Sequence, residues 1–305
     1  MESPMRMWRR AASLAGLVTI SSPFICWGTA LPAPAMQSER LVYSIMVGGL
    51  HLGDAMIGLN QTSAGYSTDM KVTARGVAKM VKNFHSDMRG EGRFAEAGAK
   101  PLPAAYSRQW STDEVASDMT MKFDAAGLAV SEERYFNPAT AAAIAPEDLP
   151  WADKRDKDKP VPADMRTNVL DPMAAFVAAR AQIMTSLALG GVAGASQTFR
   201  VPIYDGRRRY DIIGKAEAPR SSTINGVAQA VIPVTAKLEP VFGFSRKSEE
   251  RMKDSEGKFL FSNDSRFIPL QLVVSNDLLS GVMNLTADCS QNAAACETFG
   301  QEKDE

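Results

Sequence analysis

The sequence predicts a mainly β protein in which one antiparallel sheet packs against a single long helix. Short runs of alternating apolar and polar residues fill most of the chain after residue 40, a pattern typical of half-buried strands. Tight turns separate these runs at short spacing, which favours an antiparallel meander over a sheet whose strands alternate with helices. One long apolar segment near the middle of the chain has the pattern of a helix.

The N-terminus has the three parts of a secretory signal peptide. It begins with three basic side chains, Arg6, Arg9 and Arg10. The uncharged segment 11–27 follows and is short for a membrane-spanning helix, which needs about 20 apolar residues. Small residues then favour cleavage after Ala30 or Ala35. We therefore expect residues 1–35 to be a signal peptide that takes Cys26 with it, and we expect the mature chain in the periplasm.

The charge balance of the mature chain excludes some classes of partner. The whole sequence carries 34 basic and 35 acidic residues, and residues 1–35 hold three arginines and one glutamate, which leaves 31 against 34. This near-neutral balance gives no reason to expect a nucleic-acid partner. No later segment approaches the about 18 apolar residues of a membrane-spanning helix, so no transmembrane segment is expected in the mature form.

Two cysteines remain after the signal, Cys289 and Cys296. In an oxidising compartment an even pair at this spacing predicts a disulfide, and free thiols are the alternative. A zinc site is not expected, because no third cysteine or nearby histidine completes a ligand shell.

The first expected strands lie at residues 41–47, 51–62 and 66–74. Residues 77–84 interrupt the strand pattern, because their apolar residues recur with the spacing of one helical face. These residues are Val77, Met80, Val81 and Phe84. We expect this short helix to pack on the sheet.

Four further strand-like runs follow, at residues 85–96, 102–110, 115–124 and 128–136. Residues 137–169 differ, because they combine several prolines with the charge run 152–159. Such a composition buries little apolar area, and we expect a solvated surface loop there.

The long helix is expected at residues 171–189. Asp171 is a favourable N-cap residue, and Pro172 suits the first helical position. Its apolar residues extend nearly all round the helix, so it should be largely covered by the sheet.

A β-hairpin is expected around Asp205-Gly206, a pair typical of a two-residue type I′ turn. This turn pairs Ile203 with Arg208 and places Arg208 at the rim of an apolar face. The other residues predicted on that face are Phe199, Val201, Ile203, Tyr210 and Ile212. On the opposite face we expect Arg200 to meet Asp211, with Arg207 and Arg209 exposed.

The remaining strands are expected at 228–238, 258–262, 269–274 and 281–287. Residues 36–299 then make one β domain, and residues 300–305 an acidic tail without order.

No pattern of catalytic or metal-ligating residues is present in the sequence. The two histidines, His51 and His85, lack cysteine or carboxylate clusters at ligand spacing. The glycine-rich segment 190–195 follows a helix, which is the wrong context for a phosphate-binding loop. We therefore expect no enzyme, no metal and no cofactor.

Three features together resemble a known family. They are the start Y-x-I-x-V-G-G-L-x-L-G at 43–53, the helix opening Asp171-Pro172, and the segment YDGRRRYD at 204–211. These resemble the exported bacterial proteins grouped as domain of unknown function 3108, with the similarity extending over residues 41–287.

The resemblance implies a single strongly curved antiparallel sheet, an open barrel or β-spiral, with the long helix on its concave side. That shape is similar to the lipoprotein carriers of the Lol pathway. By analogy, the concave face is expected to bind a lipid-like ligand or an envelope partner protein and so to support the cell envelope. The side chains expected at this site are Arg208, Tyr210, Phe176 and Arg180.

Two other functions remain open: an interaction module without a ligand, and an envelope hydrolase. An unfilled apolar cavity beside residues 171–189 would favour ligand binding over the interaction module. Two carboxylates, or a histidine and a carboxylate, converging in a pocket would favour the hydrolase.

Overall fold

The computed structural model describes residues 37–81, 83–95, 100–150, 159–188, 197–275, 280–290, 292–297 and 299. These residues belong to one compact unit, Ala33–Glu305. The expected signal peptide 1–35, residues 152–158 of the charge run 152–159, and the tail 300–305 lie outside the described residues. Within the described residues, no helix has the length and apolar character needed to cross a membrane.

The described residues form a single antiparallel sheet of fifteen strands. The first half of the chain contributes β1 Gln37–Val47, β2 Leu50–Gln61, β3 Gly65–Ala74, β4 His85–Phe94, β5 Pro101–Ser111, β6 Ala116–Phe123, β7 Ala129–Phe136 and β8 Ala143–Ile144. The second half contributes β9 Gln197–Tyr204, β10 Arg209–Ala216, β11 Arg220–Ile224, β12 Val227–Phe242, β13 Glu256–Ser262, β14 Pro269–Ser275 and β15 Ser280–Asp288.

The strand order runs from β8 back to β1 and then continues through β15, β14, β13, β12, β10 and β9, with β11 pairing only with β12. The first and last strands of the sequence are therefore neighbours in the sheet. The strands expected from residue alternation are confirmed in both halves, whereas β8, β11 and the helix α3 (Arg246–Lys253) were not predicted.

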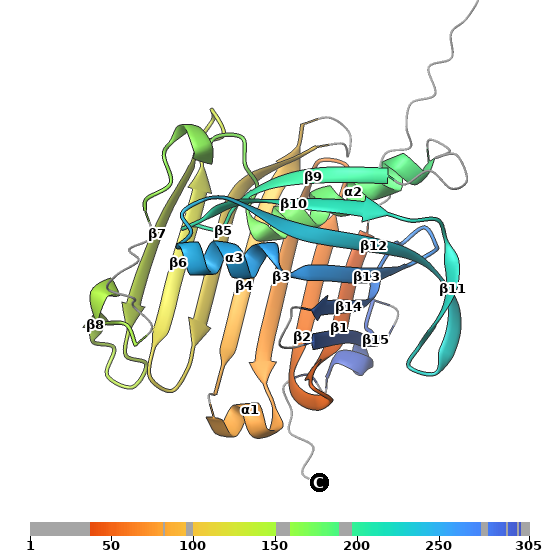
Figure 1. Cartoon of the computed structure of the whole chain (residues 1–305), viewed down its shortest axis with the longest axis horizontal. Helices are drawn as coiled ribbons and strands as arrows, with labels where there is room; N and C mark the ends of the chain where they lie inside the picture. The colour runs from red at the N-terminus through yellow and green to blue at the C-terminus, as the bar shows by residue number, and fades with distance from the viewer. Residues whose placement is uncertain are drawn as a thin grey trace, which may run out of the picture. The chain divides into compact units, whose positions relative to one another are not determined.

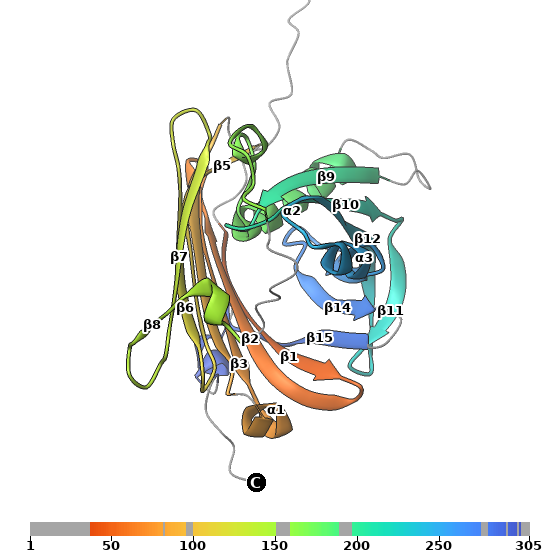
Figure 2. The ribbon, with the colours of Figure 1, turned by 60° about the vertical axis from the view of Figure 1, so that its left-hand side comes forward.

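The sheet is open and strongly curved, as the family resemblance implied. Strands β1–β7 form a tall wall, and β9–β15 curl round to face it (Figures 1 and 2). The long helix α2 (Pro172–Ala188) lies on the concave side, where it contacts β9 and the strands β3, β4 and β5. The predicted fold class is thus confirmed.

The first turn of α2 shows why the helix begins where the sequence predicts. The Asp171 carboxylate accepts hydrogen bonds from the backbone N–H groups of Met173 and Ala174, both at 2.9 Å. These groups have no partner inside the helix, so the side chain satisfies two otherwise unpaired donors. Gly90 of β4 lets this turn approach closely, because a Cβ atom there would lie 2.9 Å from that of Met173.

The core lies between α2 and the concave face of the sheet. Small helix residues, Ala174, Ala175 and Ala178, are buried and let the helix sit close to the strands. They belong to an apolar cluster with Leu59, Tyr66, Phe94, Leu170, Val177, Val201 and Ile203. Such packing orients α2 through many contacts, although the helix has no strongly polar face.

A strap formed by residues 167–170 connects the two open edges of the sheet. Thr167 bridges to Leu128 beside β7, and Leu170 bridges to Ile203 of β9. The Leu170 N–H donates to the Pro202 carbonyl at 2.9 Å, which occupies part of the exposed strand edge.

The segment 137–169 is therefore not the simple solvated loop that its composition predicted. It contains the 3₁₀ turns Pro146–Asp148 and Asp164–Arg166. Leu149, Val161 and Val169 are buried, with 7%, 6% and 4% of their surface exposed. Isolated apolar residues within a polar stretch anchor the loop on the core, and average composition does not reveal them.

The short helix α1 (Gly76–Val81) is confirmed, although it ends before the predicted residue 84. The side chains of Val77, Met80 and Val81 lie outside the described residues, so their packing stays a prediction. Phe84, the last residue of the predicted apolar stripe, lies beyond the helix and is 37% exposed.

Candidate ligand-binding site

The β9–β10 hairpin differs in register from the prediction. Tyr204 pairs with Arg209, and the Asp205 N–H donates to the Arg208 carbonyl at 3.1 Å. Gly206 and Arg207 are thus the central residues of the turn. The Asp205 carboxylate accepts from the N–H groups of Arg207 and Arg208 at 2.9 and 2.7 Å, so aspartate caps the turn and does not occupy its centre.

The face of the hairpin is nevertheless as predicted, because a shift of two positions leaves every side chain on its side of the sheet. Val201 and Ile203 are buried, and Tyr210 and Ile212 pack against the same cluster. At the rim, the Arg208 guanidinium lies 5.3 Å from the centre of the Phe244 ring, an aromatic contact that the sequence pattern did not suggest.

Arg209 was predicted to be exposed, and this was wrong. Its side chain is only 14% exposed, and its Nη1 donates to the Asp211 carboxylate and to the Tyr210 carbonyl. Arg200 donates to the same carboxylate at 2.6 Å, as predicted. A carboxylate that is only 5% exposed needs strong partners, and here two guanidinium groups satisfy it.

The tip of the hairpin docks on β6 and β7 across the opening of the sheet. The Ser131 hydroxyl donates to the Gly206 carbonyl at 2.8 Å, and Arg207 donates to the Tyr135 hydroxyl at 3.2 Å. Gly206 has a φ of +99° and lies against Met119, whose Cε would be 3.0 Å from a Cβ atom there. Only glycine suits both the conformation and the close approach.

An ion pair lies on the same side of β5 and β7 as the docked tip. Arg108 donates to Glu133 at 2.9 Å, and the Ser117 hydroxyl donates to the same carboxylate oxygen at 2.8 Å. The Nε of Arg108 is buried and has no hydrogen-bond partner among the described residues. Within the described part of the chain, this N–H group is therefore an unsatisfied buried donor.

Two tyrosines near this ion pair retain their protons. Burial raises the pKa of the Tyr106 and Tyr210 hydroxyls above the ordinary value, and the negative charge of Asp171 or Asp205 adds to the shift. They are therefore neutral hydroxyl groups at any physiological pH. Tyr210 also packs edge-on against Phe244, with ring centres 6.3 Å apart.

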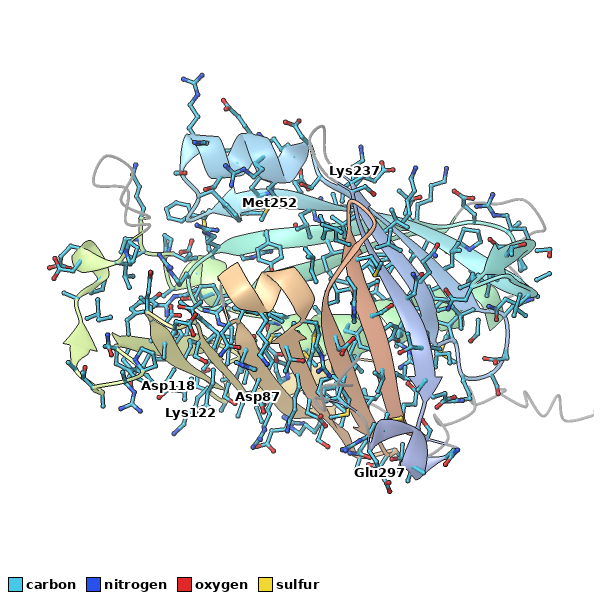
Figure 3. The ribbon with its side chains drawn as sticks, turned by 90° about the horizontal axis from the view of Figure 1, so that it is seen from below. Asp87, Asp118, Lys122, Lys237, Met252 and Glu297 are labelled. Atoms are coloured by element: carbon cyan, nitrogen blue, oxygen red, sulfur yellow. A yellow bond between two sulfur atoms is a disulfide. The ribbon has the colours of Figure 1, made fainter. Side chains whose placement is uncertain are left out.

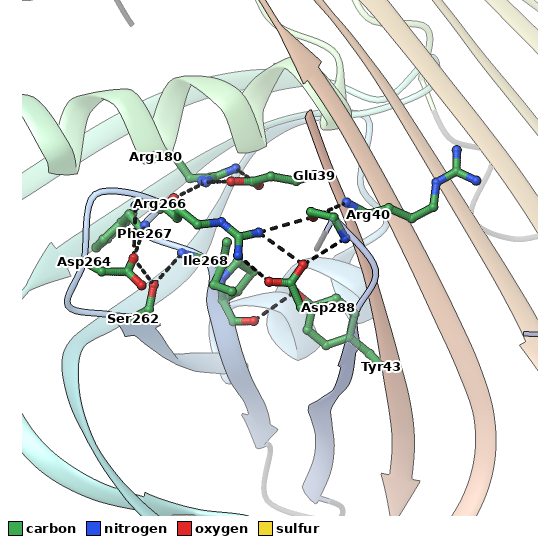
Figure 4. A network of polar contacts seen from close by, with 12 residues as sticks. Glu39, Arg40, Tyr43, Arg180, Ser262, Asp264, Arg266, Phe267, Ile268 and Asp288 are labelled. Carbon is green, nitrogen blue, oxygen red and sulfur yellow. Dashed lines mark hydrogen bonds and ion pairs between the residues drawn. The ribbon is translucent and has the colours of Figure 1, made fainter. Parts of the chain in front are cut away.

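The other two predicted site residues, Phe176 and Arg180, form a separate pair on α2. The Arg180 guanidinium lies 5.4 Å from the centre of the Phe176 ring and donates two hydrogen bonds to Glu39, at 2.8 and 3.0 Å. It also donates to the Arg266 carbonyl at 2.5 Å (Figure 4). With 6% of its side chain exposed, Arg180 anchors the helix to β1, and we withdraw it from the expected ligand contacts.

A hollow of about 330 Å³ with both apolar and polar walls lies where the strap meets β5 and the β6–β7 turn, and we call it the rim hollow. Val169 and Leu170, the two residues before the helix cap, form one wall. The opposite wall contains Leu102 and Phe123. Two basic residues, Arg93 and Lys100, and one acidic residue, Asp124, also line it.

The two histidines do not belong to a metal-ligating cluster in the described part of the chain. No group of three or more metal-ligating side chains is present there. His51 contacts Asp54 at 2.9 Å, but His51 is 46% exposed and Asp54 also accepts from Arg75. His85 contacts Asn83 at 3.0 Å.

A comparison of the sequence with protein families decides its classification. The family model described as "Protein of unknown function (DUF3108)" matches residues 42–286, from β1 to β15. The chain belongs to the DUF3108 family. The resemblance noted in residues 43–53, Asp171-Pro172 and 204–211 is thereby confirmed.

No curated protein matches this DUF3108 chain. Among solved structures, it is similar to a β-barrel-like protein of the family DUF1849 from Brucella abortus, with 11% identity and a TM-score of 0.49 over 83% of this chain and 97% of that one. A DUF1329 family protein from Desulfovibrio piger also matches, with 9% identity and a TM-score of 0.20 over 88% of this chain and 92% of that one.

Proposed function

We propose that this DUF3108 protein is a non-enzymatic protein of the periplasm that supports the cell envelope by binding a lipid-like ligand. The observation that carries the proposal is the rim hollow, because it combines apolar walls with cations. A ligand with a hydrocarbon chain and an anionic head matches both features. The signal-peptide pattern and the Cys289–Cys296 disulfide support an exported location.

The two cations are suited to an anionic head. Arg93 and Lys100 are exposed, and neither side chain has a hydrogen-bond or ion-pair partner among the described residues. Since neither group is already neutralised, an anionic oxygen gains two favourable contacts without breaking an existing ion pair.

The walls of the rim hollow lead to the core. Leu170 lines the hollow and also belongs to the apolar cluster that packs on α2. Tyr210 of the hairpin packs against that cluster. We keep Arg208 and Tyr210, with the Nε of Arg108, as proposed polar contacts on the inner side, and Phe176 as an apolar neighbour on the helix.

The test is native mass spectrometry of the mature protein purified from its own periplasm. A bound lipid-like molecule is expected in the wild type, and it should be lost in Ala104→Trp, which places a large ring at an exposed position lining the hollow. The matched control is Ala228→Trp, an equally large change at an exposed position of β12. Loss of the ligand in both variants, or its retention in Ala104→Trp, would contradict the assignment to the hollow.

A second assay separates a ligand-binding protein from an interaction module. Protein stripped of lipid is titrated with a fluorescent fatty acid, and saturable binding is expected in the wild type and in Ala228→Trp. If the wild type neither retains a lipid nor binds this probe, the chain is an interaction module and the lipid proposal fails.

A further inference from the structure

A second, larger hollow lies on the opposite face of the wall, and we call it the outer groove. It has a volume of about 610 Å³ over strands β3 to β6. Residue alternation places polar side chains on this face, and several of those in the groove are short. The short polar ones are Ser67, Ser107 and Thr120, and the small apolar Ala105 lies among them. A row of small residues between longer neighbours leaves a depression in which hydroxyl groups are exposed.

Four cations and two carboxylates line the outer groove. The cations are Arg40, Lys71, Arg89 and Lys122, and the carboxylates are Asp69 and Glu91. Lys71 and Arg89 approach Asp87 at 3.9 and 3.3 Å, distances that correspond to weak ion pairs. The groove therefore carries an excess of positive charge.

The other charges of the groove are unpaired. Within the described residues, the side chains of Arg40, Lys122, Asp69 and Glu91 make no hydrogen bond or ion pair. Figure 3 shows Asp87, Asp118 and Lys122 projecting from the same side of the wall. Nearby on this face, Asp118 is paired with Arg134 at 2.7 Å.

This contrast is informative, because adjacent opposite charges on a solvated sheet face ordinarily pair across strands. Asp118 and Arg134 do so. In the groove, cationic and anionic side chains surround the depression without pairing with one another. This arrangement suits a ligand that contacts both cations and carboxylates. Cations bind an anionic group, and carboxylates accept hydrogen bonds from neutral hydroxyl groups.

We propose that the outer groove binds a phosphorylated sugar. Arg40 and Lys122 hold the phosphate, Asp69 and Glu91 accept from sugar hydroxyls, and Ser107 and Thr120 complete the polar floor. This site is separate from the rim hollow, and its charged and hydroxyl-bearing side chains suit a ligand that carries both an anionic group and hydroxyl groups.

The test is a titration of the isotope-labelled mature protein with glucose 1,6-bisphosphate, followed by NMR. Saturable shifts are expected in amides of residues 67–71, 89–91, 105–107 and 120–122. The double variant Arg40→Gln/Lys122→Gln should bind about tenfold more weakly or worse, since it removes two charge-assisted contacts. Arg134→Gln, which removes a paired arginine of the same face, is the matched control and should bind as the wild type does.

Two control ligands complete the test. Glucose alone and sodium sulfate at matched ionic strength should each bind at least about tenfold more weakly than the bisphosphate, because each makes only part of the contacts. Equal binding of sulfate would show a general anion patch and overturn the sugar assignment. Shifts that spread over the whole sheet, or that persist in the double variant, would overturn the site itself.

Discussion

Arg180 and Glu39 show at the scale of single residues how charge is held in the core of this protein. Both side chains are nearly inaccessible, with 6% and 3% exposed, and they meet in a forked pair at 2.8 and 3.0 Å. Removing two charges from water is costly, and the pair is tolerated because its geometry is good and Arg180 also donates to a carbonyl. Its structural effect is to fix α2 against the first strand.

The first prediction concerns this pair. Arg180→Met leaves the Glu39 carboxylate buried without its cation, and we expect the free energy of unfolding to fall by about 3–5 kcal/mol. The double variant Glu39→Met/Arg180→Met should be more stable than Arg180→Met alone, because it removes the stranded charge as well. Urea unfolding of the wild type, of Arg180→Met, of Glu39→Met and of the double variant measures the coupling. Strictly additive losses would contradict a buried, interacting pair.

A second prediction at this scale concerns Arg209. Arg209→Ala takes one of two guanidinium partners from the buried Asp211 carboxylate, and we expect a loss of stability of about 1–3 kcal/mol. Lys215→Ala, at an exposed position of the same strand, is the control and should stay within about 0.5 kcal/mol. Equal thermal midpoints for both variants would mean that Arg200 alone satisfies Asp211.

At the scale of elements, the start of α2 combines two opposing effects on one carboxyl group. Asp171 is fully buried, and burial raises its pKa to about 6, although hydrogen bonds from the backbone of Ala174 and Met173 favour the charged form. Its second oxygen, Oδ2, has no partner among the described residues. The same carboxyl group therefore caps the helix through its hydrogen bonds and lies where burial disfavours its charged form.

The third prediction follows from this raised pKa. The folded protein binds the Asp171 proton more tightly than the unfolded chain, whose pKa stays near 3.8, so the contribution to stability is present below pH 4 and is lost as pH rises through 6. The shift of about two pKa units corresponds to about 3 kcal/mol. Asp171→Asn keeps a capping oxygen and cannot titrate, so its stability relative to the wild type should rise between pH 4 and pH 7.

Urea unfolding of both proteins at pH 4, 5, 6 and 7 measures this difference. Other groups titrate in both proteins, and the comparison cancels their contributions. A stability difference that does not change with pH would show that Asp171 has an ordinary pKa in the folded protein.

At the scale of the whole molecule, the seam between β1 and β15 joins the two halves of the sheet. Leu41 pairs with Asp288, and the Cys289 N–H continues the ladder by donating to the Arg40 carbonyl at 2.8 Å. Cys289 is bonded to Cys296, with their Cα atoms 5.7 Å apart, a common separation for a disulfide. Arg266 pairs with Asp288 beside it, so an ion pair and the short disulfide loop both lie at the end of the seam (Figure 4 shows the ion pair).

The fourth prediction concerns the Cys289–Cys296 disulfide at this end of the seam. Cys289→Ser/Cys296→Ser should lower the free energy of unfolding by about 2–3 kcal/mol, as expected for a short closed loop. Because the loop lies at the end of the seam, limited proteolysis should cut the variant sooner between residues 286 and 297. Ser280→Ala, at the other end of β15, is the control. Unchanged stability after reduction of the wild type would contradict a role for the bond.

Local patterns in the sequence were sufficient for several features of this protein. Alternation of residues located most strands, Asp171-Pro172 located the start of the long helix, and the even pair Cys289 and Cys296 indicated the disulfide. Each of these features depends on neighbouring residues or on their spacing along the chain, and the geometry of helices and strands gives such local patterns their meaning. The apolar face of the β9–β10 hairpin was predictable for the same reason, since period two survives a shift of two positions.

Only the tertiary structure decided the features that depend on distant residues. Arg180 meets Glu39 across 141 positions of sequence, and no local pattern indicates such a partner. Likewise, the Asp205 carboxylate accepts hydrogen bonds within the hairpin turn, which has a different register from the predicted one. The buried Asp211 carboxylate binds Arg209, which was predicted to be exposed. The rim hollow and the outer groove arise from strands and a strap that fold together. The sequence by itself determined most of the elements, whereas burial, which favours partners for most buried charges and polar groups, determined the contacts.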